Sequence, residues 1–300
     1  MVASGGRLPL VDIVPAHPAG ALSEGGVDSP YPLTTGQREA YARDGFVRLP
    51  GVFDEATLAR FRPGLSAKVA LLNTLHLPMA ERTTYEKAFL QVMNLWTKSE
   101  AVRQFVFGRR LARIAAELLG VRGVRLYHDQ ALYKEPGGGH TPWHADQYYW
   151  PLATDRCCTA WVPLQETPLE MGPLAFSAGS HRVEVGRDLP ISDESEAGMA
   201  AALERAGLAM VEEPFALGDV SFHSGWTFHR AGPNRTGRTR EVMTVITMDE
   251  DMRLAAPRNR NQEIDRETWC PGAVVGEAIE TPLNPVLYTF SSPPAAGTGR

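Results

Sequence analysis

Several features that would place the chain in a special class are scarce or missing. Only three cysteines occur among the 300 residues; Cys157 and Cys158 are neighbours and Cys270 stands alone, so the odd total provides no disulfide framework. No apolar run approaches the roughly 20 residues needed to cross a bilayer. Residues 1–20 also lack the continuous apolar segment of a secretory signal. We therefore expect a cytoplasmic protein without a membrane segment.

A basic surface for nucleic acid is missing as well. The formal net charge is -5, and neither a Lys/Arg-rich run nor zinc-finger spacing occurs. The chain also has no Walker loop, no dinucleotide-binding glycine fingerprint, no nucleophile elbow and no internal repeat. With 43% hydrophobic and 22% charged residues, the composition is that of an ordinary globular protein. The partner expected is a small molecule, and the oligomeric state stays open.

The chain divides into an arm and one domain. Residues 1–32 are rich in Gly, Ala, Pro and Ser without periodic apolar spacing, which predicts a flexible N-terminal arm. Residues 33–300 are expected to form a single domain. Its helical part covers about 33–120, its β-rich core about 121–250, and a C-terminal extension of open role 251–300.

Start and stop signals locate the helices. Thr34 or Thr35 can cap the first helix and Gly45 suits its left-handed end, after which residues 46–50 alternate as a strand. A second helix is expected to begin after Asp54 as N-cap and to be interrupted at Pro63. Residues 99–120 predict one or two amphipathic helices that end at Gly120, and residues 195–207 predict a helical insertion among the strands.

After residue 121 the apolar period changes from helical to alternating. Strand-like runs separated by Gly/Pro-rich turns cover residues 124–134, 157–165, 173–179, 219–229 and 241–248. Several short strands after a helical third of the chain predict a β-barrel or sandwich with helices packed on one side.

The segment HTPWHADQYYW, residues 140–150, carries the first chemical signal. In an extended strand, side chains two positions apart lie on one face, so His144 and Asp146 can reach the same atom while Ala145 points away. A strand with a buried histidine is the alternative interpretation. Of the eight histidines, only His144 is followed two positions later by a carboxylate.

A site of this kind needs a third ligand. Two histidines and one carboxylate on one face of an iron leave three positions open, which is the arrangement of non-haem Fe(II) oxygenases. Residues 218–240 offer both His223 and His229, six positions apart. Spacing alone does not choose between them.

Four segments in this order resemble the phytanoyl-CoA dioxygenase-like (PhyH) family of Fe(II)/2-oxoglutarate-dependent oxygenases. They are TPWHADQYYWPL, the loop MGPLAFSAGSH, the element GDVSFHSGWTFHRAGPNRTGRTR and the opening REAYARDGFVRLPGVF. The resemblance covers about residues 35–250, and the ordered set is far more specific than any one segment. It implies a mainly β fold with flanking helices around a double-stranded β-helix, the jelly-roll or cupin-like core.

The resemblance also implies roles for individual residues. His144, Asp146 and His229 would bind Fe(II), which leaves His223 and His181 as structural residues. Arg240, with Arg238 as the alternative, would pair with the far carboxylate of 2-oxoglutarate, since a guanidinium can donate two parallel hydrogen bonds. Gln130, Lys134 and Trp161 fall where the family has further cosubstrate contacts. The chain departs from the family at Ala231, where a small hydroxyl residue is common, so another donor is expected there.

The activity implied is a dioxygenase that uses Fe(II), 2-oxoglutarate and dioxygen to hydroxylate or otherwise oxidise an unactivated C–H bond of a small organic substrate. Because Asp146 is a carboxylate, halogenation is disfavoured. Tyr148, Tyr149 and Trp150 are candidates for the substrate pocket. A composition typical of a GC-rich bacterial gene makes secondary metabolism a hypothesis for its role. The alternatives are a non-catalytic jelly-roll binding protein and a cupin-type metal-dependent hydrolase.

Overall fold

The computed structural model describes residues 26–184, 186–188 and 192–291, and two antiparallel sheets form its centre. The helices and strands, in chain order, are α1 (Thr35–Asp44), β1 (Phe46–Leu49), α2 (Glu55–Leu72), α3 (Thr84–Ala88), β2 (Leu90–Met93), α4 (Glu100–Val106), α5 (Arg109–Leu119), β3 (Gly123–Tyr133), β4 (Thr141–His144), β5 (Cys157–Pro163), β6 (Leu174–Ser177), α6 (Asp193–Arg205), β7 (Met210–Glu212), β8 (Val220–Ser224), β9 (His229–Ala231), β10 (Val242–Asp249), α7 (Arg260–Trp269) and β11 (Val286–Thr289).

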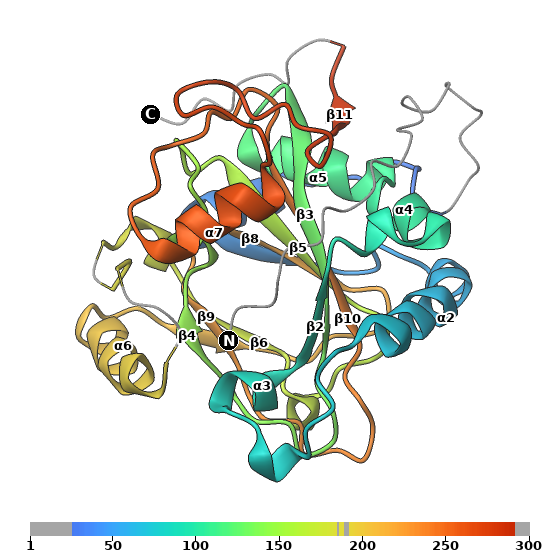
Figure 1. Ribbon diagram of the computed structural model, residues 1–300, viewed down its shortest axis with the longest axis vertical. Coiled ribbons are helices and arrows are strands. Elements are labelled where there is room, and N and C mark those ends of the chain that lie inside the picture. Colours follow the sequence, from blue (N-terminus) through green and yellow to red (C-terminus); the bar gives the residue numbers. More distant parts are fainter. Residues whose placement is uncertain (1–25, 185, 189–191, 292–300) are drawn as a thin grey trace.

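The larger sheet has seven strands in the order β1-β8-β5-β10-β3-β11, and β2 pairs with β3 as well. Helices α2, α4 and α5 cover its outer face (Figure 1). Alternate residues of β5 show how the strand serves both faces: Cys158 and Ala160 pack with the helices in the main hydrophobic core, whereas Trp161 belongs to a separate apolar cluster. The inner face of this sheet is therefore available to line a barrel.

The smaller sheet has four strands in the order β4-β9-β6-β7. Its residues Leu174, Phe176 and Ala231 pack with Trp161 and Val242 of the larger sheet, so the two sheets enclose a common interior. Two antiparallel sheets that face each other with flanking helices confirm the double-stranded β-helix predicted from the sequence.

The helix signals near the N-terminus are confirmed, with one exception. The side chain of Thr34 caps α1, Gly45 ends it at φ 81°, and Asp54 caps α2. The predicted interruption at Pro63 is wrong, because α2 continues through Pro63 to Leu72. The proline removes one backbone hydrogen bond, but α2 is fixed on both sides of it by burial of Phe61 and Leu65 in the core. Residues 99–120 form two helices, α4 and α5.

The run over residues 219–229 is two strands and not one. Strand β8 belongs to the larger sheet and β9 to the smaller, so the chain crosses the barrel between Ser224 and His229. Periodicity alone did not reveal the crossing, because Phe228 and Trp226 continue the apolar pattern through the turn.

Both ends of the described chain pack onto this core. Residues 26–32 are the part of the expected arm that the structure describes, and the rest of the arm lies outside the described residues. Val27 contacts the core, and Arg110 of α5 donates hydrogen bonds to the carbonyls of Val27 and Ser29. At the other end, β11 adds a strand to β3. Part of the C-terminal extension is thus integral to the larger sheet.

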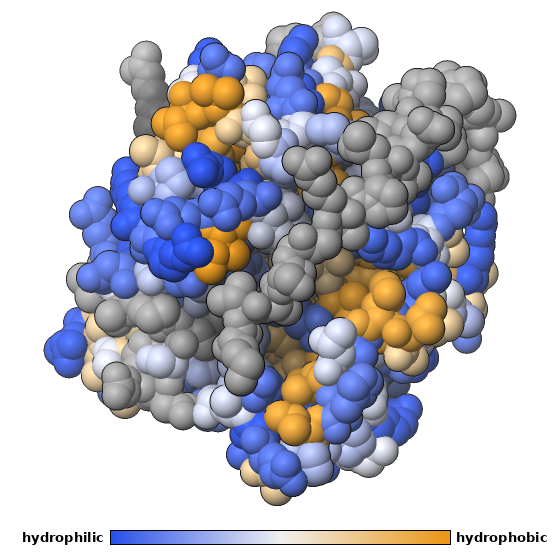
Figure 2. Space-filling view, viewed as in Figure 1, coloured by the Kyte–Doolittle hydropathy of each residue, from blue (hydrophilic) through white to orange (hydrophobic). Residues whose placement is uncertain are grey.

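The surface of the described part is mixed. Figure 2 shows a mainly hydrophilic face whose largest apolar patch lies beside β2 and β10. Among the described helices, none combines the length and the apolar character that crossing a membrane requires.

Candidate metal centre and cosubstrate pocket

The end of β4 brings His144 and Asp146 together. The strand stops at His144, and a 3-10 helix, Asp146–Tyr148, begins two residues later. The amide of Gln147 donates to the Gly225 carbonyl at 2.9 Å, which holds this turn against the β8–β9 connection. Nε2 of His144 and Oδ1 of Asp146 are 3.7 Å apart. The two side chains therefore converge as the sequence predicted, although the second belongs to a turn and not to the strand.

His229 is placed by the turn that crosses the barrel. The Gly45 carbonyl accepts hydrogen bonds from the Ser224 amide at 2.9 Å and from the Thr227 hydroxyl at 2.7 Å. The Phe228 amide donates to the Ser180 hydroxyl at 2.9 Å. The Gly-Ser-His loop and the end of α1 thus hold the residues immediately before His229 in place. Three segments that are far apart in the sequence therefore meet at this turn.

The two histidines lie opposite each other in the smaller sheet. His144 is the register partner of His229, and the ring centroids are 4.1 Å apart. Each Nδ1 faces a backbone carbonyl: that of Pro142 at 2.8 Å for His144, and that of Thr227 at 2.9 Å for His229. A carbonyl only accepts, so each Nδ1 carries the hydrogen and each Nε2 has a lone pair.

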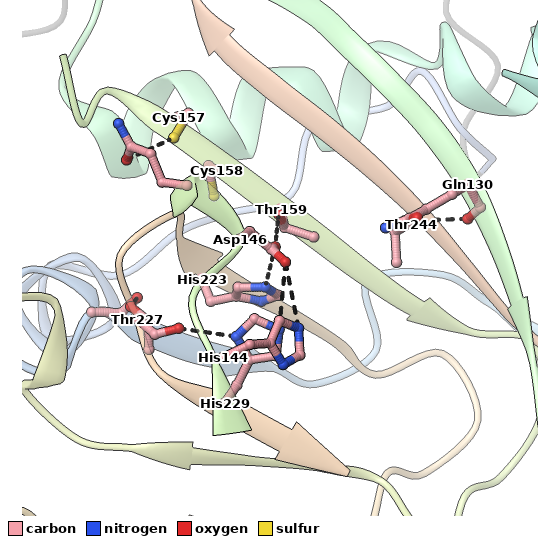
Figure 3. Close-up of polar contacts among 12 residues, drawn as sticks. Gln130, His144, Asp146, Cys157, Cys158, Thr159, His223, Thr227, His229 and Thr244 are labelled. Carbon is pink, nitrogen blue, oxygen red and sulfur yellow. Dashed lines mark hydrogen bonds and ion pairs between the residues drawn. The ribbon is translucent and has the colours of Figure 1, made fainter. Parts of the chain in front are cut away.

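One ligand atom from each of His144, Asp146 and His229 lies within 4.8 Å of the others (Figure 3). Oδ1 of Asp146 is 3.7 Å from Nε2 of both histidines. Two imidazole nitrogens and one carboxylate oxygen around one point form the ligand set of a facial metal site.

The protonation states suit a cation. Burial lowers the pKa of both His144 and His229 to about 4, so the imidazoles are neutral at pH 7. Burial alone would raise the pKa of the Asp146 carboxyl, but His229 and the hydrogen bond from His223 hold this pKa below its usual range. Neutral imidazoles and an ionised carboxylate are the forms that bind metal.

Two contacts to Asp146 were not predicted. Oδ2 lies 3.3 Å from Nε2 of His223 and 3.1 Å from the Thr159 hydroxyl. His223 is thus not remote from the site, although it is absent from the converging group of ligand atoms. Nothing in the sequence pointed to Thr159, because its contact depends on the pairing of β5 with β8.

Arg240 is buried two residues before the start of β10. Its guanidinium lies 5.4 Å from the centre of the Trp161 ring, and Nη1 donates to the Gly172 carbonyl. Burial lowers the pKa of Arg240 to about 9. Among the described residues no carboxylate pairs with it and Nε has no hydrogen-bond partner, whereas the alternative, Arg238, is exposed at the surface. A buried, unpaired cation of this kind favours an anionic ligand.

The interior around Arg240 is apolar apart from a few donors. Trp161, the aromatic neighbour of Arg240, belongs to an apolar cluster with Phe46, Leu132, Leu174, Phe176, Phe215, Ala231 and Val242. The indole Nε1 of Trp161 is buried without a hydrogen-bond partner in the described chain. Unmet donors in apolar surroundings can bind a small anion and keep water away from it.

Thr141 contributes another donor that sequence analysis missed. It pairs with Ala231 while His144 pairs with His229, so β4 has one more residue than β9 over the same span. This bulge places Thr141 on the same face as His144, the face toward the interior. The Thr141 hydroxyl is buried and has no partner within the described ranges. It therefore lies opposite the position at which Ala231 lacks the hydroxyl expected from the family.

Gln130 and Lys134 are held by other groups. Gln91 donates to Oε1 of Gln130 at 2.6 Å, and Tyr85 donates in turn to Gln91 at 2.8 Å. Nζ of Lys134 donates to the carbonyls of Gly139 at 2.6 Å and Gly232 at 2.8 Å. Burial, with Arg240 nearby, lowers the pKa of Lys134 to about 6. The Lys134 amine thus joins two loops near Arg240, and Gln130 belongs to a polar chain that reaches α3.

The remaining aromatic candidates differ in burial. Trp150 is buried against Tyr127 and His128, and Tyr148 and Tyr149 are partly exposed. The Tyr148 carbonyl accepts hydrogen bonds from Asn259 and from Gln262 of α7, and Trp269 lies 5.5 Å from the His128 ring. Helix α7 therefore covers the side of the barrel next to the Asp146 turn.

Known proteins show the same sequence pattern and fold. The profile of the phytanoyl-CoA dioxygenase (PhyH) family matches residues 41–242. "Dioxygenase lolE1" from Epichloe uncinata is 26% identical over 226 residues, which are 72% of this chain and 83% of that protein.

Among solved structures, the epimerase SnoN from nogalamycin biosynthesis, in complex with Fe3+, alpha ketoglutarate and nogalamycin RO, has a TM-score of 0.71 and 26% identity, with 84% of this chain and 98% of that chain covered. The carbocyclase SnoK from the same biosynthesis has a TM-score of 0.70 and 24% identity, with 86% and 99% covered. The predicted family, fold and dioxygenase class are confirmed. The chain belongs to the phytanoyl-CoA dioxygenase (PhyH) family.

Proposed function

We propose that the protein is an Fe(II)- and 2-oxoglutarate-dependent oxygenase that hydroxylates, or otherwise oxidises, a C–H bond of a small organic molecule. The observation that carries this proposal is the convergence of two neutral imidazoles and one carboxylate in a barrel that also buries an arginine without a carboxylate partner among the described residues. A metal alone would not account for Arg240. A metal and a dicarboxylate together account for both features.

The residues fit the two ligands. His144, Asp146 and His229 would hold the iron on one face through Nε2, Oδ1 and Nε2. Arg240 would pair with the far carboxylate of 2-oxoglutarate, and the unmet donors on Trp161 and Thr141 would supply further hydrogen bonds. When bound, iron with 2-oxoglutarate would activate dioxygen, so that dioxygen, 2-oxoglutarate and the substrate are converted to succinate, carbon dioxide and the oxidised substrate.

The protein's own residues would orient the metal ligands and exclude water from the bound cosubstrate. The Nδ1 hydrogen bonds of His144 and His229 fix both rings, so the ligand set is in place before a metal arrives. The apolar walls around Trp161 and Phe176 exclude water from the cosubstrate. The opposite side, toward Trp150, His128 and α7, would receive the substrate.

SnoN and SnoK, whose names place them in nogalamycin biosynthesis, support a small organic substrate and a role in secondary metabolism. Hydroxylation, epimerisation and ring closure all begin with removal of a hydrogen atom, and the site residues are compatible with each.

Anaerobic titration tests the proposal. Apo-protein is titrated with Fe(II) and then with 2-oxoglutarate, and the visible charge-transfer band of a chelated 2-oxo acid is recorded. The band should require His144 for iron binding and Arg240 for tight 2-oxoglutarate binding, as His144→Ala and Arg240→Ala will reveal. Iron binding without a band, or without succinate formation in air, would overturn the proposal and favour a metal-dependent hydrolase. Absence of iron binding would favour a non-catalytic barrel.

A further inference from the structure

The two oxygens of the Asp146 carboxylate lie in unequal surroundings. Oδ1 faces Nε2 of His144 and Nε2 of His229, each at 3.7 Å. Oδ2 faces Nε2 of His223 at 3.3 Å and the hydroxyl of Thr159 at 3.1 Å. One oxygen is thus directed to the metal position and the other to potential donors in the larger sheet (Figure 3).

The two donors are fixed to each other. Thr159 of β5 and His223 of β8 are direct register partners in the larger sheet. Asp146 approaches them from the turn after β4, in the opposite sheet. The hydrogen bonds to Oδ2 therefore join the two walls of the barrel at the height of the metal site.

His223 has the features of a donor and not of a ligand. Its Nε2 is directed at Oδ2, and the converging ligand atoms belong to His144, Asp146 and His229. A carboxylate oxygen only accepts, so Nε2 must carry hydrogen. Nδ1 has no hydrogen-bond partner among the residues described, and the ring is held between Phe176 and His229 at centroid distances of 5.4 and 4.5 Å.

We propose that His223 and Thr159 are positioning residues that hold Asp146 as a one-oxygen ligand. With Oδ2 occupied by two donors, the carboxylate cannot turn to place both oxygens on the metal. Three metal positions then stay open, as a chelating 2-oxo acid and dioxygen together require. This inference rests on the proposed function, because it assigns a purpose to the geometry of the same triad.

Removal of the donors has a defined consequence. Without them Oδ2 is buried and unsatisfied, and its nearest compensation is the metal itself. The carboxylate would rotate toward two-oxygen binding and occupy a position that the cosubstrate needs. Because outer hydrogen-bond partners of metal ligands change metal affinity by about 10- to 100-fold, the effect is measurable in binding and does not depend on turnover.

Matched pairs of variants test the proposal. His223→Leu and Thr159→Val remove the donors, whereas His223→Gln and Thr159→Ser keep an N–H or an O–H. His181→Gln serves as the histidine control, since His181 does not contact Asp146. Fe(II) affinity, 2-oxoglutarate affinity of the iron-loaded protein and thermal unfolding are measured for each, and vanadyl ion is used as a probe for counting bound histidine nitrogens by pulsed electron paramagnetic resonance.

We expect the Fe(II) affinity of His223→Leu and Thr159→Val to change by about 10- to 100-fold. Both variants should show a weaker 2-oxoglutarate band even at saturating iron. His223→Gln and Thr159→Ser should stay close to the unmodified protein, with two histidine nitrogens on the probe throughout. Equal metal and cosubstrate binding in all variants would overturn the proposal. The proposal would also be overturned if the vanadyl probe bound three histidine nitrogens in the unmodified protein and two in His223→Gln, since His223 would then be a ligand.

The two hypotheses fail in different ways. If the unmodified protein binds iron but gives no 2-oxoglutarate band, the proposed function fails, while the metal affinities of the paired variants still report on Asp146. If the band forms normally and the donor-removing variants match the unmodified protein, only the positioning role fails.

Discussion

Arg240 is the single residue whose surroundings restrict the ligand most. It is buried, lies against the face of Trp161, and has no carboxylate partner in the part of the chain that the structure describes. Desolvation of such a cation is costly unless an anion compensates it. Under the proposed function, we expect the choice of cosubstrate to depend more on this residue than on the metal ligands.

Replacement of Arg240 by lysine should weaken 2-oxoglutarate binding while leaving the metal site intact. Lysine keeps the charge but loses the planar fork that can hold a carboxylate with two bonds. Loss of one charge-assisted hydrogen bond, about 1.5–3 kcal/mol, corresponds to a roughly 10- to 100-fold rise in the dissociation constant. The measurement is titration of the iron-loaded protein with 2-oxoglutarate. Arg238→Lys is the matched control, and an equal loss there would contradict the assignment.

Thr141 allows a test with a rescue. Thr141→Val removes a buried hydroxyl without changing the shape of the side chain, and we expect a roughly 10-fold loss in 2-oxoglutarate affinity if this hydroxyl contacts the cosubstrate carboxylate. Ala231→Ser added to Thr141→Val should recover part of the loss, because residues 141 and 231 are register partners on the same face. Unchanged affinity in Thr141→Val would show that the hydroxyl is not used.

These residues also show what sequence alone could reach. His144 and Asp146 are two positions apart, and a resemblance chose His229, so the converging set was predicted. The inward position of Thr141 was not predicted, because three positions separate it from His144 and only the bulge in β4 turns it inward. The contacts of His223 and Thr159 with Asp146 were not predicted, because they require the register between β5 and β8.

At the scale of elements, buried polar groups fix the ends of short segments. The 3-10 helix Leu95–Thr97 begins after Asn94, and the carboxylate of Asp129 on β3 accepts the amides of Leu95 at 3.0 Å and Trp96 at 3.3 Å. Burial raises the pKa of Asp129 to about 7, despite these hydrogen bonds. The β2–α4 connection is therefore attached to β3 through an ionisable group.

This pKa predicts a pH-dependent stability. Because the folded pKa of Asp129 is above its unfolded value near 4, its contribution is fully present below about pH 4 and is lost as pH rises through about 7. Asp129→Asn cannot ionise. The unfolding free energy of Asp129→Asn relative to the unmodified protein should therefore rise between pH 5 and pH 8, by up to about 3 kcal/mol. Urea unfolding at several pH values measures the difference, and a constant difference would refute the prediction.

Element boundaries were predicted where the signal is local and missed where it is not. Thr34, Gly45 and Asp54 act through their own neighbours, and all three were placed correctly. Pro63 carries an equally strong local signal, but packing of α2 on the larger sheet overrides it. The crossing between β8 and β9 depends on Gly45, a residue about 180 positions away, so no local pattern could show it.

At the scale of the whole molecule, two elements that lie beyond the residues matched by the family profile, β11 and α7, pack onto the barrel. Strand β11 extends the larger sheet, and α7 is attached to the turn after Asp146 through the Tyr148 carbonyl. A tyrosine–aspartate hydrogen bond, 2.5 Å between Tyr127 and Asp265, adds a further link between β3 and α7. Composition and periodicity beyond residue 250 indicated none of this, because these elements take their positions from the core that they cover.

His229 of the triad lies beside Phe176 and Arg240 beside Trp161, and both aromatic residues belong to one apolar cluster. Metal and cosubstrate should therefore stabilise the whole domain together. A ligand at 100 times its dissociation constant adds about 2.7 kcal/mol to the unfolding free energy, which corresponds to a rise of about 5 °C in Tm for a domain of this size. We expect Fe(II), kept anaerobic, to raise Tm and 2-oxoglutarate to raise it further only when the metal is present. His144→Ala should abolish both shifts, whereas His181→Ala should keep them. A 2-oxoglutarate shift that persists in metal-free protein would separate the anion site from the triad and contradict a shared centre.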